Sequence, residues 1–231
     1  MSNNALMKYV EDANLPAMSD EAMANALQDA GGEAASGGEG GVQYLSFSGK
    51  SGTYQLGQNK EEPEGLFIVE PQSIVTGWIC WLKSKPIDRV EWSIYQAEKA
   101  IAEDELEDHG PYRETHGEGW FQSLGFGCLS LDDGDVQVKF SNNSKSGRNA
   151  IRDLMDEIRK RVLAGEPSMP VIEFDAEEFT AQDQKNYKPL LSVEAWVSRE
   201  AVAAWRDGSL DQDKLLAGET PKKKKRNGSK R

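Results

Sequence analysis

From Val42 onward, the chain alternates apolar and polar residues with a period of two. The alternation is clearest in residues 87–95 (IDRVEWSIY), where Val90, Trp92 and Ile94 share one face, and in residues 135–141 (DVQVKFS). Successive side chains of a β-strand point to opposite faces, so this pattern is typical of half-buried antiparallel strands. It predicts a β-rich domain and constrains the possible folds more than any other feature of the sequence.

Turn residues divide the alternating region into short strands. Gly49-Lys50-Ser51 and Asp132-Asp133-Gly134 each predict a hairpin, and Ser84-Lys85-Pro86 predicts a turn. The expected strands are 42–48, 52–57, 66–70, 73–83, 87–95, 120–131, 135–141, 170–174 and 188–198. Residues 98–119 are acidic and end in glycines, which predicts a surface loop.

One amphipathic helix is predicted over residues 148–164. Its apolar stripe is Ile151, Leu154, Met155, Ile158 and Val162. Either Ser144 or Ser146 can cap its start, and Gly165 ends it. Two strands and small C-terminal helices follow. This order predicts an α+β fold, in which an antiparallel, barrel-like sheet of OB type carries one main amphipathic helix. Other open sheets covered by one helix fit the same order.

Two arms of opposite charge flank the predicted core of residues 42–218. Residues 1–41 hold one Lys against seven acids and include the glycine-rich linker GGEAASGGEGG, so we expect a flexible acidic arm. Residues 219–231 hold seven Lys and Arg against one Glu, which predicts a disordered polybasic tail. The whole chain has a net charge of −12, so the core is also acidic. An acidic core argues against a uniformly basic surface for polyanions but allows a local basic stripe.

The sequence offers little support for catalysis. No nucleophile–base pair stands out, and His109 and His116 lie in the acidic loop at a separation that matches no closed metal site. We therefore expect no enzyme activity, no metal and no cofactor. Cys80 and Cys128 lie in apolar strands and are expected to be buried free thiols in a reducing, cytoplasmic environment. No apolar run is long enough for a membrane span.

Aromatic and cationic residues coincide on the less apolar strand faces. Trp78 and Trp81 are three apart on one strand and so point to opposite faces, and Tyr95 shares the face of Arg89 on the next strand. Rings with interleaved cations are what sequence-independent binding of single-stranded nucleic acid requires. A second layer that covers the rings is the alternative. The candidate nucleic-acid-binding residues are Trp78, Trp81, Arg89, Tyr95, Lys145, Arg148, Lys185, Tyr187 and Lys188.

The runs FIVEPQSIVTGWICW, FSNNSKSGRNAIRDLMDEI and NYKPLLSVEAWVS resemble small proteins encoded near replication and recombination genes of tailed phages. The shared features are a GW-x-x-W strand, a G-R-x-A-I helix start, a P-V-I strand and a Y-x-P…W-V strand, spread over residues 42–200. Several such proteins look like OB-type single-stranded-DNA binders. The resemblance implies single-stranded DNA as ligand, replication or recombination proteins as partners, and the bacterial host cytoplasm as location. Such binders typically end in an acidic tail, whereas this chain ends in a basic one.

The sequence therefore predicts sequence-independent binding of single-stranded DNA in phage replication or recombination. The rival prediction is a phage interaction or inhibitor module that engages a host protein through its acidic surface. A choice between DNA and RNA, and the oligomeric state, are left open.

Overall fold

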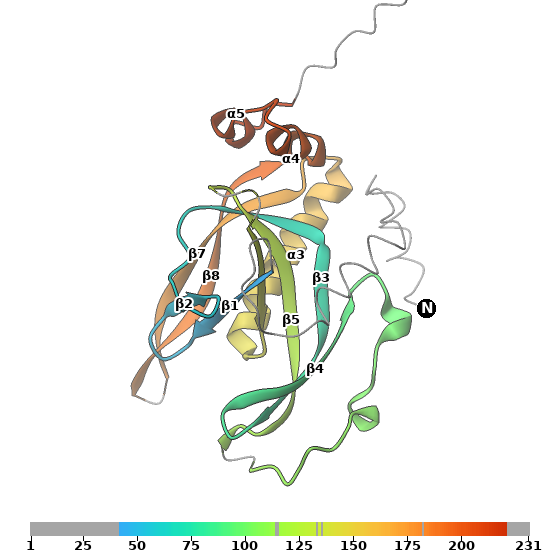
Figure 1. The fold of residues 1–231 in the computed structure, drawn as a ribbon, viewed down its shortest axis with the longest axis vertical. Helices are drawn as coiled ribbons and strands as arrows, with labels where there is room; N and C mark the ends of the chain where they lie inside the picture. Colours follow the sequence, from blue (N-terminus) through green and yellow to red (C-terminus); the bar gives the residue numbers. More distant parts are fainter. Residues whose placement is uncertain (1–41, 114–115, 133, 135, 182, 221–231) are drawn as a thin grey trace, which may run out of the picture.

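The computed structural model describes residues 42–113, 116–132, 134, 136–181 and 183–220. The predicted acidic arm (1–41) and nearly all of the predicted basic tail (221–231) lie outside the described residues. The described chain is α+β: a sheet curled into a half-barrel, a long helix against it and two short helices at one end (Figure 1). Among the described helices, none combines the length and hydrophobicity needed to cross a bilayer.

The elements follow the predicted order. The strands are β1 (Gln43–Ser48), β2 (Thr53–Leu56), β3 (Phe67–Leu82), β4 (Lys85–Ser93), β5 (Gly119–Ser130), β6 (Gln137–Asn142), β7 (Met169–Ala181) and β8 (Gln184–Val197). The helices are α3 (Lys145–Ala164), α4 (Arg199–Arg206) and α5 (Gln212–Leu216), and the short 3-10 turns are η1 (Ala97–Lys99) and η2 (Glu103–Glu105).

The sheet is mixed, which corrects the prediction of a purely antiparallel one. Its order is β2-β1-β6-β5-β3-β7-β8, with β4 paired to the second half of β3. The exception to antiparallel pairing is β1 beside β6, where Gln43 aligns with Val138 and Leu45 with Phe140. A parallel pair needs a long crossover, and here β2 to β5 supply it. Alternation within a strand carries no information about the direction of its neighbour, so the sequence pattern did not reveal this pair.

Strand β3 joins the parts of the sheet. The predicted strands 66–70 and 73–83 are one continuous strand with an irregularity between Glu70 and Val75. At this point the Ser73 hydroxyl donates to the Glu70 carbonyl (2.6 Å) and accepts from the Gly127 N–H (2.7 Å). The start of β3 pairs with β7, its second half pairs with β4, and β5 lies along its other side.

Gly77 explains why β4 can pair so closely with β3. A Cβ at this position would lie 2.0 Å from the carbonyl oxygen of Val90. Any side chain here would push the two strands apart, so the glycine of the GW pair is required by backbone approach.

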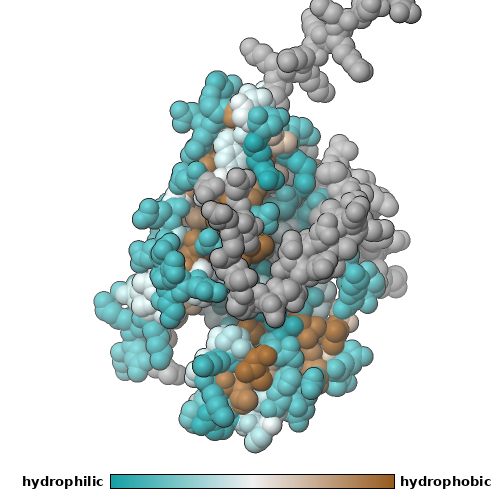
Figure 2. All heavy atoms as spheres, in the orientation of Figure 1, coloured by the Kyte–Doolittle hydropathy of each residue, from teal (hydrophilic) through white to brown (hydrophobic). Residues whose placement is uncertain are grey.

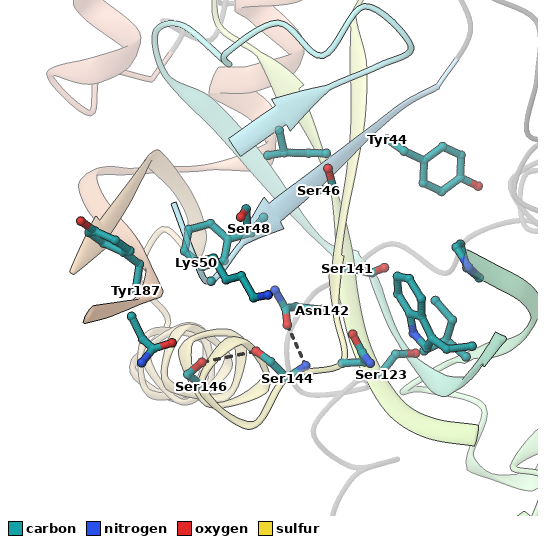
Figure 3. Close-up of a pocket in the computed structure, with 18 of the residues that line it drawn as sticks. Tyr44, Ser46, Ser48, Lys50, Ser123, Ser141, Asn142, Ser144, Ser146 and Tyr187 are labelled. Atoms are coloured by element: carbon teal, nitrogen blue, oxygen red, sulfur yellow. Dashed lines mark hydrogen bonds between the residues drawn. The ribbon is translucent and has the colours of Figure 1, made fainter. Parts of the chain in front are cut away.

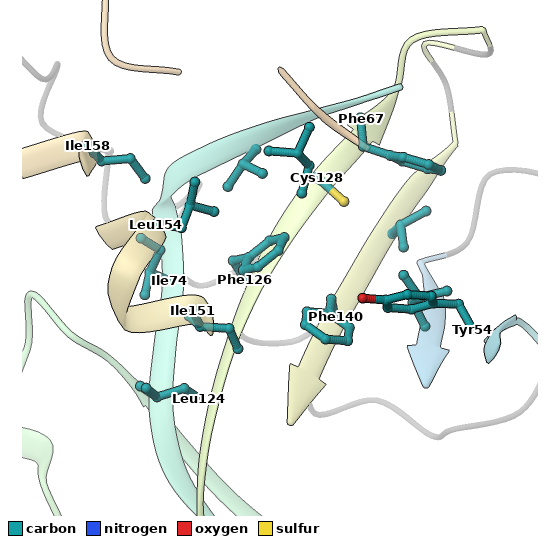
Figure 4. Close-up of a cluster of buried hydrophobic side chains, with 14 residues drawn as sticks. Tyr54, Phe67, Ile74, Leu124, Phe126, Cys128, Phe140, Ile151, Leu154 and Ile158 are labelled. Carbon is teal, nitrogen blue, oxygen red and sulfur yellow. The ribbon is translucent and has the colours of Figure 1, made fainter. Parts of the chain in front are cut away.

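The main core fills the inner face of the curled sheet. Phe140 lies at its centre, with its ring centroid 5.6 Å from that of Phe126, 5.4 Å from Phe174 and 5.9 Å from Tyr54 (Figure 4). Both cysteines are buried and free, as predicted. The inner-face core comprises Leu45, Tyr54, Phe67, Val69, Ile74, Leu124, Phe126, Cys128, Val138, Phe140 and Ile172 from the sheet and Ile151, Leu154 and Ile158 from α3.

Helix α3 has the predicted cap and the predicted end, but it begins at Lys145, three residues before the predicted start at 148. The Ser144 hydroxyl accepts from the Gly147 N–H at 3.0 Å, and Gly165 ends the helix in the left-handed region at φ 70°. The predicted stripe packs on the sheet, with Ile151, Leu154 and Ile158 buried.

The outer face of the sheet carries a second, smaller core at one end. Helices α4 and α5 cover Ile68 of β3 and Val171 of β7 there, and Leu215 of α5 is fully buried. An irregularity in the pairing of β7 with β8 divides the alternating apolar residues of β8 between the two cores: Val193 packs in the inner core, whereas Val197 packs in the outer one. The remaining outer face, over β1, β6, β5 and the β3–β4 end, is left uncovered by α4 and α5 (Figure 1).

Residues 97–113, here called the strap, run from β4 towards β5 along the β3–β4 end of the sheet (Figure 1). Two indoles anchor the strap: Trp78 donates to the Ile101 carbonyl and Trp120 to the Glu107 carbonyl, both at 2.9 Å. Beyond the strap, the buried Glu118 accepts from the backbone N–H groups of Arg113 (2.9 Å) and Lys83 (3.1 Å).

Replacing Leu154 by Ala should destabilise the protein by about 2–5 kcal/mol, because the cavity would open between α3 and the sheet. Leu163 lies on the same helix but is 63% exposed, so Leu163→Ala is the matched control and should change the free energy of unfolding by less than about 0.5 kcal/mol. Urea unfolding followed by circular dichroism measures both. Equal effects would contradict the packing described for α3.

The folded protein should become less stable at acidic pH, because Glu118 becomes protonated. Hydrogen bonds from the Arg113 side chain, followed by those from backbone N–H groups, lower the pKa of Glu118 from 4.5 to about 2. The unfolded chain therefore binds a proton more readily, so this contribution is complete above pH 4.5 and is lost as the pH falls towards 2. Glu118→Gln should remove this part of the pH dependence. The check is thermal unfolding of both proteins between pH 7 and pH 2, and two parallel curves would rule out this role.

Candidate functional site

An open groove of about 570 Å³ lies where β1, the β3–β4 end and the start of α3 meet the tip of the β7–β8 hairpin (Figure 3). Figure 2 shows the molecule hollowed between that hairpin tip and the β4 end. The side chains in the groove come mainly from the outer face of the sheet. The lining residues are Tyr44, Leu45, Ser46, Phe47, Ser48, Gly49, Lys50, Ile79, Trp81, Pro86, Arg89, Ser123, Ser141, Asn142, Asn143, Ser144, Ser146, Phe179, Asn186 and Tyr187.

Hydroxyl and amide groups form much of the groove wall. Alternation along β1 places Ser46 and Ser48 on the side of Tyr44. Across from them, the Asn142 carboxamide oxygen accepts from the Ser144 N–H at 2.8 Å, and the hydroxyls of Ser144 and Ser146 lie 3.3 Å apart. Such groups can donate and accept, so the wall suits a ligand rich in polar atoms.

A buried ion network supports the positive side of the groove. Lys139 of β6 lies 2.5 Å from a Glu91 carboxylate oxygen, and Arg89 lies 3.0 Å from the other oxygen. Arg89 also donates to the Ser141 hydroxyl at 2.8 Å. Both cations lie 5.9 Å from the ring centroid of Tyr44. Two cations share one carboxylate, so this part of an acidic protein is locally positive.

The floor of the groove contains two polar atoms without partners. The Ser123 hydroxyl and the Trp81 indole N–H are buried and form no hydrogen bond with any described residue. Ser123 is 2% exposed. An unsatisfied buried polar group costs about 1–3 kcal/mol, so each favours a ligand or water that supplies its partner.

Aromatic rings stand at intervals along the groove. Tyr44 is 37% exposed and Phe179 is 38% exposed, and Trp81 and Tyr187 are half-buried. The Tyr187 backbone is held by its N–H donating to the Gly49 carbonyl at 2.8 Å, which brings β8 to the β1–β2 turn.

The structure brings three of the predicted binding residues into this groove: Trp81, Arg89 and Tyr187. Lys145 lies beside it, exposed between Ser144 and Ser146. Trp78 and Trp81 lie on opposite faces, as predicted from their spacing, because Trp78 faces the strap and Trp81 the groove.

The other predicted residues form bonds within the protein. The Tyr95 hydroxyl donates to the Pro71 carbonyl at 3.0 Å. Arg148 donates to the carbonyls of Gln122 and Asn143, and burial, followed by the nearby Arg152, lowers its pKa. Two lysines form exposed ion pairs, Lys185 with Glu178 and Lys188 with Glu177, each at 3.0 Å. None of these residues lines the groove, so the predicted set is divided among separate places.

Sequence reasoning missed Tyr44, Lys50 and Ser123. The first two lie in YLSFSGK, which was interpreted as a strand and the turn of a hairpin. The alternation Tyr44, Ser46, Ser48 was the available signal, since it gives β1 a polar face with a ring. No signal marked Ser123, because its importance comes from a missing partner in three dimensions.

Comparison with models of known protein families, with curated proteins and with solved structures finds no match.

Glu91→Ala should destabilise the protein by up to about 3–5 kcal/mol, because it leaves the Lys139 ammonium buried without its counter-charge. The double variant Glu91→Leu with Lys139→Met should recover most of that loss, since no buried charge is then unpaired. Denaturant unfolding of the three proteins tests the network. A double variant no more stable than Glu91→Ala would refute it.

Proposed function

We propose that the groove binds single-stranded nucleic acid without sequence preference, with single-stranded DNA as the leading ligand. The observation on which the proposal rests is that rings and cations line one groove: Tyr44, Trp81 and Tyr187 with Lys50 and Arg89. The Ser123 hydroxyl and the Trp81 N–H, which have no partner among the described residues, favour a polar environment beside them.

The groove offers a suitable side chain for each chemical part of a single strand: its bases, its phosphates and its sugars. Bases offer flat faces, and Tyr44, Trp81 and Tyr187 offer rings on which they can stack. Phosphates carry negative charge, and Arg89 and Lys50 line the same groove. Hydroxyls and carboxamides along the wall can bond to sugars and base edges without selecting one base.

Single strands fit better than a duplex. In a duplex the base faces are stacked on one another, so rings in a groove cannot reach them. Stacking contributes about 1–3 kcal/mol of binding free energy per base. Stacking on Tyr44, Trp81 and Tyr187 can therefore favour binding although the protein as a whole is acidic.

The wider assignment to phage replication or recombination, in the bacterial cytoplasm, is part of the same proposal. It is supported by the resemblance of residues 42–200 to tailed-phage proteins and by the half-barrel with its helix placed before the last two strands. An OB-type relationship is the finer form of this fold and belongs to the proposal.

Trp81→Ala should weaken binding of a fluorescein-labelled oligo-dT by roughly ten-fold or more, since one stacked base is lost. Arg89→Gln should weaken it and reduce its salt dependence, because one phosphate contact is lost. The matched control is Lys185→Ala with Lys188→Ala: these residues were predicted from sequence to bind phosphate but lie outside the groove. Fluorescence anisotropy at two salt concentrations measures all three in the full chain.

The controls separate the groove from the tail. If the lysine double variant weakens binding while Trp81→Ala and Arg89→Gln do not, the strand binds at Lys185 and Lys188 and the groove is not the site. If only removal of residues 221–231 weakens binding, binding belongs to the basic tail.

The rival proposal is an interaction or inhibitor module for a host protein. The exposed acidic residues of β7, Glu173, Glu177 and Glu178, support it, as does the net charge of −12. A protein partner would be favoured if oligo-dT fails to bind at low salt and charge reversal on β7 abolishes capture of a host DNA-binding protein.

A further inference from the structure

A second site lies at the same end of β4 as the groove but on the opposite face of the sheet. Asp88 of β4 meets Glu107 and His109 of the strap, and one ligand atom from each lies within 4.8 Å of the others. The closest contact joins His109 Nε2 to an Asp88 carboxylate oxygen at 2.8 Å. These are the nitrogen and oxygen donors that divalent metal ions take in proteins.

Hydrogen bonds orient Asp88 and Glu107 before any ion arrives. One Asp88 oxygen accepts from the Arg89 N–H at 2.6 Å, which leaves the other oxygen towards His109. The Glu107 carbonyl accepts from the Trp120 indole, fixing the backbone beside this ligand.

The histidine is held in the same way. Its backbone N–H donates to the Tyr112 hydroxyl at 2.8 Å, and its ring centroid lies 5.7 Å from that of Trp120. The His109 backbone is therefore held by Tyr112 and its ring lies beside Trp120, with Nε2 directed to Asp88.

The charges of this cluster are unbalanced. The two carboxylates converge on one imidazole, and no described Lys or Arg forms an ion pair with either of them. A single protonated imidazole can offset only one negative charge, whereas a divalent cation offsets both. Two ligands bonded to one ion at about 2.0–2.2 Å lie roughly 3 Å apart, which is close to the spacing of His109 and Asp88.

We propose that Asp88, Glu107 and His109 bind a divalent first-row transition-metal ion such as Zn²⁺ or Mn²⁺. One imidazole with two carboxylates suits these ions better than Ca²⁺ or Mg²⁺, which take all-oxygen sites. Three protein ligands leave the remaining positions to water. The site does not depend on the proposed nucleic-acid groove.

The bound ion ties the strap to the sheet. Asp88 belongs to β4, whereas Glu107 and His109 belong to the strap, so the ion links two segments that are otherwise joined by few hydrogen bonds. Because an ion that binds the folded chain alone stabilises it, a hundred-fold excess over Kd should raise Tm by about 5 °C or more.

The test uses the full chain after EDTA treatment, titrated with ZnCl₂ and separately with MnCl₂ in a calorimeter. We expect one site, with affinity reduced at least ten-fold in His109→Ala and in Glu107→Gln. The chain has two histidines, so His116→Ala is the matched control and should bind as the wild type does. Glu107 is exposed, which makes Glu107→Gln safe for folding if His109→Ala is not.

A second measurement locates the ion. Limited proteolysis of the strap should slow when Zn²⁺ is added to the wild type and to His116→Ala, but not to Glu107→Gln. The proposal is overturned if neither ion binds at 100-fold the protein concentration, or if Glu107→Gln and His109→Ala bind as the wild type does. Loss of binding only in His116→Ala would also overturn it.

Discussion

The continuity of β3 is the constraint on which the rest of the structure depends. This single strand pairs with β5 along one side and with β7 and then β4 along the other, so its path sets the curl of the whole sheet. The irregularity between Glu70 and Val75 allows the change of partner from β7 to β4. Where the regular β3–β5 pairing is interrupted, the Ser73 side chain bonds to Glu70 of β3 and to Gly127 of β5. Without this irregularity, β3 could not pair with β7 near α4 and α5 and also with β4 at the opposite end.

The two ends of the outer face differ because only one is covered. Around Ile68 the outer face is apolar and α4 and α5 bury it. Towards β4 the same face carries Lys139, Glu91 and Arg89, which are bonded to one another beneath Tyr44. Charged groups of this kind are stable without a covering helix because they satisfy one another and reach solvent through Arg89, which is 30% exposed. The groove is the consequence of leaving that region open.

The sequence predicted local structure better than spatial assembly. The alternation of apolar residues located the strands, and the capping residues located α3. Ser144 caps the start of that helix and Gly165 ends it, as expected. The β3–β4 turn was misplaced because Lys83 and Ser84 both adopt positive φ without the glycine or asparagine that normally marks such a turn. The parallel β1–β6 pair left no local trace either.

Only part of the candidate site was predicted, because the sequence indicates residue types but not which of them come together in space. Trp81, Arg89 and Tyr187 were found as rings and cations on polar faces, and they do meet in one groove. Arg148, Lys185 and Lys188 show the same residue types, but they lie outside the groove and bond to carbonyls and carboxylates there. Residue type indicates what a side chain can bind, whereas only the fold decides which of these side chains come together.

The β3–β4 ribbon also connects the groove with the strap. Trp78 and Trp81, three residues apart, bond to the strap on one face and line the groove on the other. On β4, Asp88 faces His109 while the next residue, Arg89, faces the groove, and the Asp88 carboxylate accepts the Arg89 N–H. At this end of the sheet β4 is an edge strand that pairs only with β3 among the described strands, so cover on one face helps to hold its side chains in place on the other. The strap provides that cover, and the position of the groove residues Trp81 and Arg89 follows from it.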